Sequence, residues 1–438
     1  MQDLAPADNY QIVLPNRFAD EVRSREEANF PKAFAKEFFI NYPGFDGHRQ
    51  GLLDDWFIQE LVRVKLTQSL NLITHDLVDE TTASTKDIYG DNSEWHTVLL
   101  KGTISELVTR LSSRVFLGLP LCRNKRWLDI AQNYTVDAFV AAHLMRMVPG
   151  IVRPLAYLVI PQCWRLRAQV SDARKLIMPE IEMRKERAQK AMEAGKKPPK
   201  TSDTIGWMYE VSRGRDVDYV AAQLSLTMAA IHTTTEATAQ AIKDICEHPE
   251  IVQPLREEIV SVISENGWTK PALQKLRLMD SFLKESQRCT PIGIVSMNRY
   301  VEKEFELSDG TILPTGSRFF VAGAFNDPLI YKDPEKFDAF RFCSKLEPGQ
   351  VNSWAHVTTS ASHMGFGHGQ HACPGRFFAS NEIKVALCHL LLKYDWALVE
   401  GEEPQIFRFE SNNSMSPKSK VSVRRRKEEM NLDLDLQE

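Results

Sequence analysis

The sequence predicts a mostly α-helical protein with a small β region late in the chain. Through the first half, apolar residues recur at spacings of three and four, the pattern of helices that bury one face. A long helical pattern then runs from Asp218 to Glu247. Between Glu304 and Pro314, polar and apolar residues alternate around Asp309-Gly310, which is typical of a β-hairpin. With 438 residues, 43% of them hydrophobic, the chain can bury a large core.

The elements can be placed in chain order by their periodicity and by the residues that end them. Pro249 ends the long helix, and Pro291 ends the helix expected over residues 283–289, because the residue preceding a proline avoids the helical conformation. Residues 196–203 indicate a surface loop. The expected helices cover residues 52–77, 104–115, 218–247, 251–266, 283–289 and 380–393, and residues 11–14 form an early strand. Residues 424–438 are charged without a core pattern, so we expect a disordered tail there.

Charge and cysteine content exclude several classes of protein. The chain has 54 Lys and Arg against 58 Asp and Glu, a net charge of −4, which disfavours a general nucleic-acid binder. Its seven cysteines form no CxxC pair, and their odd number favours a reducing compartment over a disulfide framework. No secretory signal opens the sequence. The uncharged stretch from Tyr219 to Thr235 is shorter than the roughly 20 apolar residues that span a membrane, so we predict a buried core helix.

The most unusual segment is the glycine-rich loop from Met364 to Arg376, ahead of a helix. Its four glycines indicate backbone that turns sharply or lies close to something flat or bulky. Cys373 precedes the helix start, where backbone N–H groups favour a thiolate, and a thiolate is a soft metal ligand. Two alternatives stay open at this point. Cys373 could be a small core residue, or it could join His363, His368 and His371 in a zinc site, although zinc ligands usually come as two separated pairs.

The run Phe366-Gly-His-Gly-Gln-His371-Ala-Cys373-Pro-Gly375 closely resembles the haem-binding loop of the cytochrome P450 family, whose pattern is Phe-x-x-Gly-x-Arg-x-Cys-x-Gly. The resemblance implies haem b as the cofactor, with Cys373 as the axial iron ligand and Phe366 packed beside the sulfur. His371 stands where the family usually has Arg. The resemblance places it against a haem propionate, with a charge that depends on pH.

Two further segments resemble the same family in the same order. Glu285-Ser-Gln-Arg288 resembles its Glu-x-x-Arg helix signature, and Arg341 lies in a segment that resembles its meander. The resemblance implies that one carboxylate is held by two guanidinium groups, a rigid charge-assisted arrangement that would fix the Cys loop. We therefore expect structural, not catalytic, roles for these three residues.

The long helix contains Ala229-Ala-Ile-His232-Thr233-Thr234, which resembles the oxygen-binding stretch of the family. The resemblance implies that Thr233 orders dioxygen and helps to deliver protons. His232 stands where the family has an acid, and an imidazole can relay protons near neutral pH. The alternative is a buried neutral histidine that bonds a helix carbonyl.

Basic side chains should face the two carboxylates of a haem. Arg299 resembles the propionate-binding Arg of the family, and Arg63 occupies the position of the Arg in its Trp-x-x-x-Arg helix. Gln59 stands at the Trp position, so a solvated surface Arg is an equal alternative for Arg63.

Substrate contacts are expected from Met228, from residues 291–296 and from residues 413–415. Their Ile, Val and Met side chains favour a lipophilic substrate held mainly by shape. Core packing explains the same residues without a ligand.

The resemblance implies one P450-like catalytic domain over residues 1–438. We expect a monooxygenase that inserts one oxygen atom of O2 into a lipophilic natural product, with electrons from NADPH through NADPH-cytochrome P450 reductase. The texture of the sequence is similar to that of fungal secondary-metabolism members that act on terpenoid-like scaffolds. The alternatives are a haem-thiolate isomerase or dehydratase that needs no reductase, and an inactive haem-binding remnant.

Eukaryotic members of the family begin with a membrane anchor and a first helix. The likeness here starts near residue 9, so we expect both to be missing and this chain to be soluble or peripheral. A full-length form would face the cytosol from the endoplasmic reticulum membrane. Residues 147–161 could touch a membrane surface or cover the substrate pocket.

Overall fold

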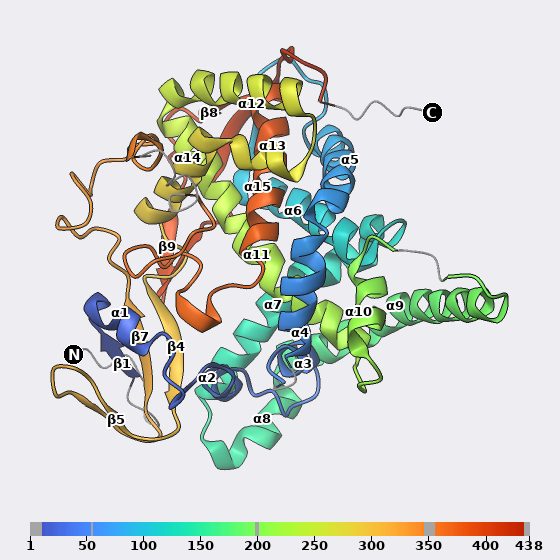
Figure 1. Cartoon of the computed structure of the whole chain (residues 1–438), viewed down its shortest axis with the longest axis vertical. Coiled ribbons are helices and arrows are strands. Elements are labelled where there is room, and N and C mark those ends of the chain that lie inside the picture. The colour runs from blue at the N-terminus through green and yellow to red at the C-terminus, as the bar shows by residue number, and fades with distance from the viewer. Residues whose placement is uncertain (1–10, 54–55, 198–200, 346–354, 433–438) are drawn as a thin grey trace. The chain divides into compact units, whose positions relative to one another are not determined.

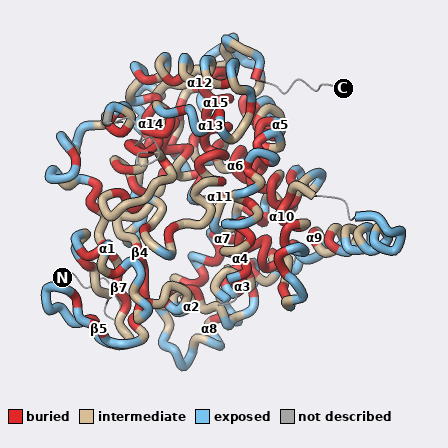
Figure 2. Tube along the Cα trace, in the orientation of Figure 1, coloured by how far each residue is buried: buried red, intermediate tan, exposed pale blue. Residues whose placement is uncertain are grey.

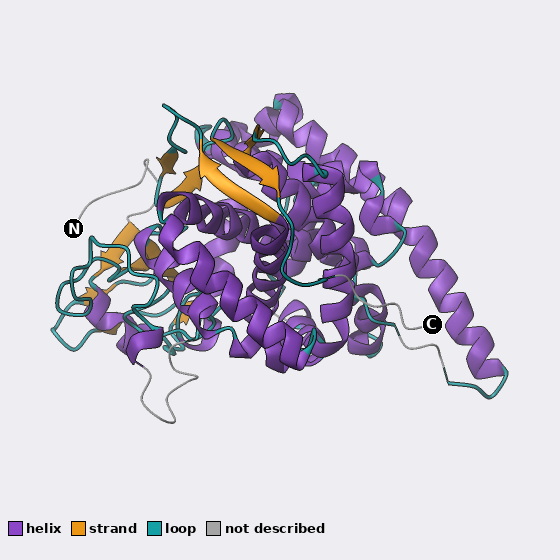
Figure 3. Cartoon of the chain, turned by 90° about the horizontal axis from the view of Figure 1, so that it is seen from above, coloured by secondary structure: helices purple, strands orange, loops and turns teal. Residues whose placement is uncertain are grey.

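The computed structural model describes residues 11–53, 56–197, 201–345 and 355–432. Helices predominate and the strands are short (Figure 3), so the predicted fold class is confirmed. The chain divides into two compact units. Among the described residues, those within 11–34, 85–104 and 233–432 form the first unit, and those within 35–84 and 105–232 form the second. The single domain expected over 1–438 stays a prediction.

The first unit is built around α15 (Arg376–Lys393), which is buried along nearly its whole length (Figure 2). Lys384 of α15 pairs with Asp280 at 2.7 Å and thereby joins α15 to α14. The other elements of this unit are the helices α1 (Ala19–Val22), α12 (Val252–Asn266), α13 (Lys270–Lys275) and α14 (Arg277–Cys289), together with all of the strands (Figure 1).

The strands form two sheets and two hairpins. In the four-stranded sheet the order is β1 (Gln11–Leu14), β7 (Arg318–Ala322), β4 (Val295–Val301) and β2 (Ala28–Asn29). β1 is parallel to β7, whereas β7 with β4 and β4 with β2 are antiparallel pairs. The three-stranded antiparallel sheet has the order β3 (His96–Leu99), β11 (Lys420–Arg425) and β8 (Tyr394–Leu398). The hairpins are β5 (Phe305–Glu306) with β6 (Ile312–Leu313) and β9 (Ile406–Phe409) with β10 (Asn412–Met415).

Helices are the regular elements of the second unit, whose described residues include no strand. Four helices run from one unit into the other: α2 (Phe30–Phe38), α5 (Leu70–Tyr89), α6 (Leu100–Leu117) and α11 (Tyr219–Glu247). Those within the unit are α3 (Asp46–Gly51), α4 (Phe57–Glu60), a π-helical turn (Leu61–Leu66), α7 (Lys125–Arg146), α8 (Arg153–Val159), α9 (Pro161–Glu193) and α10 (Thr204–Ser212).

Most elements lie where the periodicity placed them. The early strand is β1, the hairpin around Asp309-Gly310 is β5 with β6, and the long helix is α11. The helix expected over 52–77 is instead interrupted between α4 and α5, and α14 begins six residues before the predicted start at 283.

The disordered tail expected over 424–438 is wrong for residues 424–432. Arg424 and Arg425 belong to β11, whose alternating Val421 and Val423 are buried, and Leu432 is fully buried. Arg425 and Arg426 pair with acids three residues on, at 2.7 and 2.8 Å, so local ion pairs satisfy the charges. Residues 433–438 lie outside the described residues.

A search of the described residues for a helix long and apolar enough to cross a bilayer found none. The stretch Tyr219–Thr235 belongs to α11, most of whose side chains there are buried, as the core-helix prediction required.

Candidate active site

The loop that precedes α15 is folded back on itself by main-chain hydrogen bonds. The N–H of Cys373 donates to the carbonyl of Phe366 at 2.8 Å, and the N–H of Ala372 donates to that of Gly369 at 3.1 Å. Gly367 and Gly369 adopt φ angles of +72° and +77°, which favour glycine. A Cβ on Gly369 would also lie 2.5 Å from that of Arg23. The glycines are therefore required by the turns that present Cys373.

The Cys373 side chain meets opposing influences. Burial raises the pKa of its thiol, whereas hydrogen bonds from the N–H groups of Gly375 and Arg376, and the positive charge of Arg376, act to lower the pKa. These donors belong to the start of α15, so they suit an anionic sulfur. A bound metal ion would take the place of the thiol proton. Cys373 is partly exposed, so a ligand can reach the sulfur. Together with the two N–H donors, this fits a thiolate ligand to iron.

The zinc alternative finds no support in the described part of the chain, where no three His, Cys, Asp or Glu side chains are grouped to hold a metal ion. His363 contacts Gln287 Oε1 at 3.0 Å, and His368 contacts Asp20 Oδ1 at 2.9 Å. Both imidazoles therefore have other partners.

Arg299 and His371 meet on the ring of Phe30. The guanidinium lies 5.5 Å from the ring centroid, and the imidazole stacks on the same ring at a centroid distance of 5.5 Å. The sequence indicated both basic residues but carried no signal for Phe30, which begins α2 and is more than 260 residues from either of them along the chain.

Arg299 is a buried cation that forms no ion pair with the described residues. It is 2% exposed, and its side chain donates to the carbonyl of Asn298 at 2.9 Å. Among the residues that the structure describes, no carboxylate lies within ion-pair distance of this guanidinium, and burial lowers its pKa to about 10. Because a buried unpaired charge is costly, the site fits a carboxylate supplied by a cofactor, such as a haem propionate.

The predicted carboxylate cluster is present. Both Glu285 oxygens accept from Arg288, at 2.8 Å each, and the Nε of Arg341 lies 2.9 and 3.0 Å from the same two oxygens. Glu285 and Arg288 are fully buried and Arg341 is 6% exposed. The two guanidinium groups also donate to carbonyls of Pro334, Lys336 and Lys332. The cluster therefore fastens the meander to α14.

Thr233 lies on an open strip of α11. Thr233 and Ala229, four residues apart on one face, are exposed, whereas most of their neighbours in the helix are buried. His232 is half-buried. The oxygen-binding role of Thr233 and the proton relay through His232 stay predictions.

Arg63 belongs to a different unit of the structure from the other two basic residues. It is exposed, in the π-helical turn of the second unit, whereas Arg299 and His371 belong to the first. Its propionate role stays a prediction. Met228 also lies in the second unit, half-buried in α11.

Two of the expected substrate segments lie side by side. The N–H and the side-chain amide of Asn413 donate to the carbonyls of Ile292 and Pro291, at 2.7 and 2.8 Å. The N–H of Ile294 donates to Ser411 at 2.9 Å. The β9–β10 hairpin is therefore bound to the segment that follows α14.

Asp244 in α11 is a buried carboxyl that makes stability depend on pH. Its Oδ1 accepts from Gln240 at 2.6 Å. Burial raises its pKa from 3.8 to about 7, although a hydrogen bond from Ser286 opposes the shift. Because the folded pKa lies above the unfolded one, the folded protein binds more protons between these two values. The free energy of unfolding therefore falls as pH rises through that window.

We expect Asp244→Asn to be more stable than the wild type near pH 8, by up to about 4 kcal/mol, and to lose most of this advantage near pH 5. The amide keeps an oxygen for Gln240 but never ionises. Thermal unfolding of both proteins at the two pH values measures the difference. A difference that is the same at both values would contradict the assignment.

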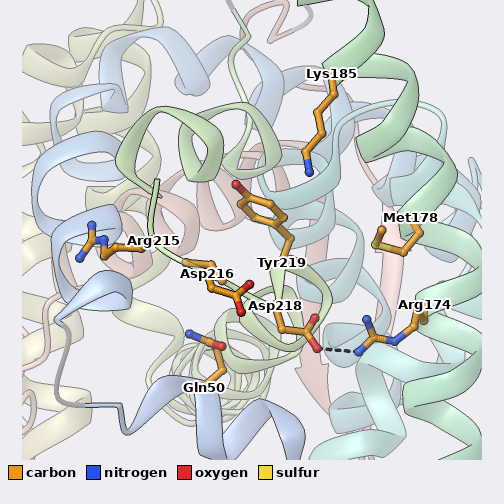
Figure 4. Close-up of a pocket in the computed structure, with 9 residues that line it drawn as sticks. Gln50, Arg174, Met178, Lys185, Arg215, Asp216, Asp218 and Tyr219 are labelled. Atoms are coloured by element: carbon orange, nitrogen blue, oxygen red, sulfur yellow. Dashed lines mark hydrogen bonds and ion pairs between the residues drawn. The ribbon is translucent and has the colours of Figure 1, made fainter. Parts of the chain in front are cut away.

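A cavity of about 570 Å³ lies within the second unit, where α9 meets the start of α11 (Figure 4). Arg174 pairs with Asp218 across it at 2.6 Å, and Arg215, also in its wall, pairs with Glu60 at 2.9 Å. Its lining is largely charged, and Arg174, Asp218 and Arg215 already have partners of opposite charge. It does not fit a lipophilic substrate, and no sequence motif indicated it.

The family model described as "Cytochrome P450" matches residues 63–424 of this chain. Among curated relatives, cytochrome P450 monooxygenase bsc2 of Alternaria brassicicola is 45% identical over 434 residues, covering 98% of this chain and 83% of the relative. Cytochrome P450 monooxygenase 1 of Gibberella fujikuroi is 43% identical over 422 residues, covering 95% of this chain and 96% of the relative.

A solved structure, the retinoic acid bound cyanobacterial CYP120A1, shares the fold with a TM-score of 0.67 at 17% sequence identity. The match covers 95% of this chain and 89% of that one. The matched motifs, the relatives and the fold agree, and this chain belongs to the cytochrome P450 family.

Proposed function

We propose that this P450 monooxygenase oxidises a lipophilic, terpenoid-type natural product with electrons from NADPH-cytochrome P450 reductase. The family binds iron protoporphyrin IX through a cysteine thiolate, and the relatives are fungal monooxygenases. When bound, the haem supplies the activation of dioxygen. The observation that carries the proposal is the partly exposed Cys373 on its glycine loop, with amide donors from α15 aimed at the sulfur.

The residues of this chain have distinct tasks in the proposal. Cys373 ligates the iron, Phe366 packs beside the sulfur, and Arg299 and His371 neutralise the propionates. Phe30 holds these two basic side chains in place. Thr233 positions dioxygen, and His232 relays protons from solvent to the threonine hydroxyl. The β9–β10 hairpin and residues 291–296, which follow α14, exclude water and orient the substrate.

A spin-state screen tests the function. Candidate terpenoids are added to the haem-loaded chain, and the absorption spectrum reports which of them displaces water. NADPH-dependent oxygen consumption coupled to product then supports a monooxygenase. Product formed without NADPH would favour an isomerase or dehydratase, and a spectral response with no product from any compound would favour an inactive remnant.

Proton delivery gives the sharpest test of the residue roles. We expect Thr233→Ala to keep NADPH consumption but to release hydrogen peroxide. Without the threonine hydroxyl, protons would no longer be directed to the oxygen atom whose protonation leads to product. His232→Ala should slow coupled turnover by roughly 10²-fold and change its pH dependence near neutrality. NADPH, peroxide and product are measured together.

Thr238→Ala is the matched control, because its hydroxyl donates to the carbonyl of Thr234 at 2.8 Å, away from the open strip. It should leave coupling unchanged. If His232→Ala also leaves rate, coupling and pH profile unchanged, His232 is a core histidine and the relay is wrong.

We also propose that residues around α8 rest on the cytosolic face of the endoplasmic reticulum membrane. Apolar side chains gather there with large exposed fractions: Met147 70%, Ile151 90%, Leu155 66%, Val159 72% and Trp164 58%. A patch of this kind is costly in water and suits a lipid interface.

Flotation with phosphatidylcholine and phosphatidylserine vesicles tests the membrane contact. Ile151→Glu with Leu155→Glu should weaken vesicle binding by roughly 10²-fold or more, because each large side chain contributes about 1.5–3 kcal/mol when it is buried. Leu329→Glu, at a residue 94% exposed in the first unit, is the control. Equal flotation of all three proteins would refute the patch.

A further inference from the structure

Glu236 of α11 holds a carboxylate on which donors from two other segments converge. Its Oε1 lies 2.5 Å from the ammonium of Lys101 and accepts from the hydroxyl of Ser414 at 2.7 Å. Its Oε2 accepts from the N–H of Met415 at 2.9 Å. Lys101 donates in turn to Ser414 Oγ at 2.7 Å and to the carbonyl of Met415 at 3.1 Å. All four residues belong to the first unit.

This pair differs from an ordinary surface ion pair. The Lys101 and Glu236 side chains are 22% and 15% exposed, whereas those of Lys420 and Glu402, 3.0 Å apart in the same unit, are 42% and 48% exposed. Exposed pairs contribute little because water screens them. Glu236 is also bound to main chain, so losing it would leave an N–H of β10 without its acceptor.

The network ties together three segments that form the proposed substrate site. Glu236 lies three residues after Thr233, hence near it along one face of α11. Ser414 and Met415 belong to β10, and Asn413 beside them binds the carbonyls of Pro291 and Ile292. Hydrogen bonds thus join α11 to β10, and Asn413 of the same strand joins β10 to the segment after α14.

We propose that Glu236 is a positioning residue that clamps β10 to α11 and so sets the size and shape of ligand that the substrate site admits. The effect on ligand selectivity rests on the proposed function. The contacts of Glu236 with Lys101, Ser414 and Met415 do not, because they lie within the first unit whatever it binds. Glu236 touches no reacting atom. Both of its oxygens already accept hydrogen bonds, one of them from a cation, so the carboxylate is engaged in holding β10.

Two measurements on the haem-loaded full chain test the clamp. Hydrogen exchange at the Met415 amide reports the hold on β10. The haem absorption spectrum reports the binding of imidazole and of 4-phenylimidazole, two iron ligands that differ by one phenyl ring. For Glu236→Gln and for Lys101→Met, we expect the Met415 amide to exchange about tenfold faster or more, as for a lost hydrogen bond to a charged group.

The size selectivity of the site should change in the same variants. A loosened wall makes fewer contacts with a bulky ligand, so the dissociation constant of 4-phenylimidazole should rise about tenfold relative to that of imidazole. The red-shifted ferrous–carbonyl band should be kept, because the thiolate is untouched. Ser414→Ala, which removes one hydrogen bond and leaves the ion pair, should give smaller changes of the same sign.

Glu402→Gln is the matched control, since it breaks the exposed Lys–Glu pair of the same unit. If Glu236→Gln leaves both readouts at the wild-type values, as this control should, the clamp is wrong. Faster exchange with unchanged azole selectivity would also overturn the proposal, because Glu236 would then only stabilise the fold. Failure of the proposed function is separate, because wild-type protein would then lack the red-shifted band or give no product.

Discussion

Cys373→Ala is expected to abolish the strongly red-shifted absorption band of the ferrous–carbonyl form, and with it all turnover. The band would require a thiolate ligand to the haem iron, and Cys373, on the glycine loop at the start of α15, would supply it. Alanine keeps the loop conformation, since the hydrogen bond to Phe366 comes from the main chain. Haem binding should weaken but not vanish, because the proposed propionate partners Arg299 and His371 are unchanged.

The other cysteines supply the control. Cys343→Ala removes a partly buried thiol whose pKa burial raises, in a short helical turn outside the loop. It should keep both the band and turnover. If the band survives in Cys373→Ala, or is lost in Cys343→Ala, the ligand assignment is wrong.

Glu285→Gln is expected to lower haem retention and the free energy of unfolding, not the rate of the chemical step alone. The amide cannot neutralise Arg288 and Arg341, which are 0% and 6% exposed, so two guanidinium groups are left buried without their anion. Breaking a buried pair in this way costs about 3–5 kcal/mol. Arg288→Leu should give a loss of similar size, because it strands the carboxylate and frees the carbonyl of Pro334.

Chemical denaturation and the haem content after gel filtration measure both effects. Asp129→Asn is the matched control, because Arg126 and Asp129 have the same spacing but are 47% and 51% exposed. It should change stability by less than about 1 kcal/mol. A Glu285→Gln protein that holds haem normally and loses only turnover would contradict the structural role.

The elements that could be predicted from the sequence are those whose signal is local. The period of α11 and its stop at Pro249, the Asp309-Gly310 turn and the short apolar strand β1 depend on neighbours within a few residues. The tail prediction failed because it relied on charge alone. Arg425 and Arg426 are paired within a turn of chain, and Leu432 is buried where the carbonyl of the same residue accepts from the Trp268 indole at 3.1 Å.

The same distinction holds for the charged clusters. Glu285 and Arg288 share one helix turn, so a motif identifies them. Glu80 is equally buried and is held by Arg110 and Arg123 at 2.6 and 2.7 Å, within the second unit. Its partners lie 30 and 43 residues away, and no local pattern indicates them.

For the site, the sequence by itself determined the family and singled out the Cys373 loop and the Thr233 stretch as candidates, because these depend on short runs whose residue types the chemistry requires. Only the tertiary structure decided which distant residues complete them. Phe30 joins Arg299 to His371, and Lys101 meets Glu236 beside Ser414, across separations that no periodicity encodes. Burial then sets the strength of each contact, since a charge removed from water needs a partner that only the fold can bring.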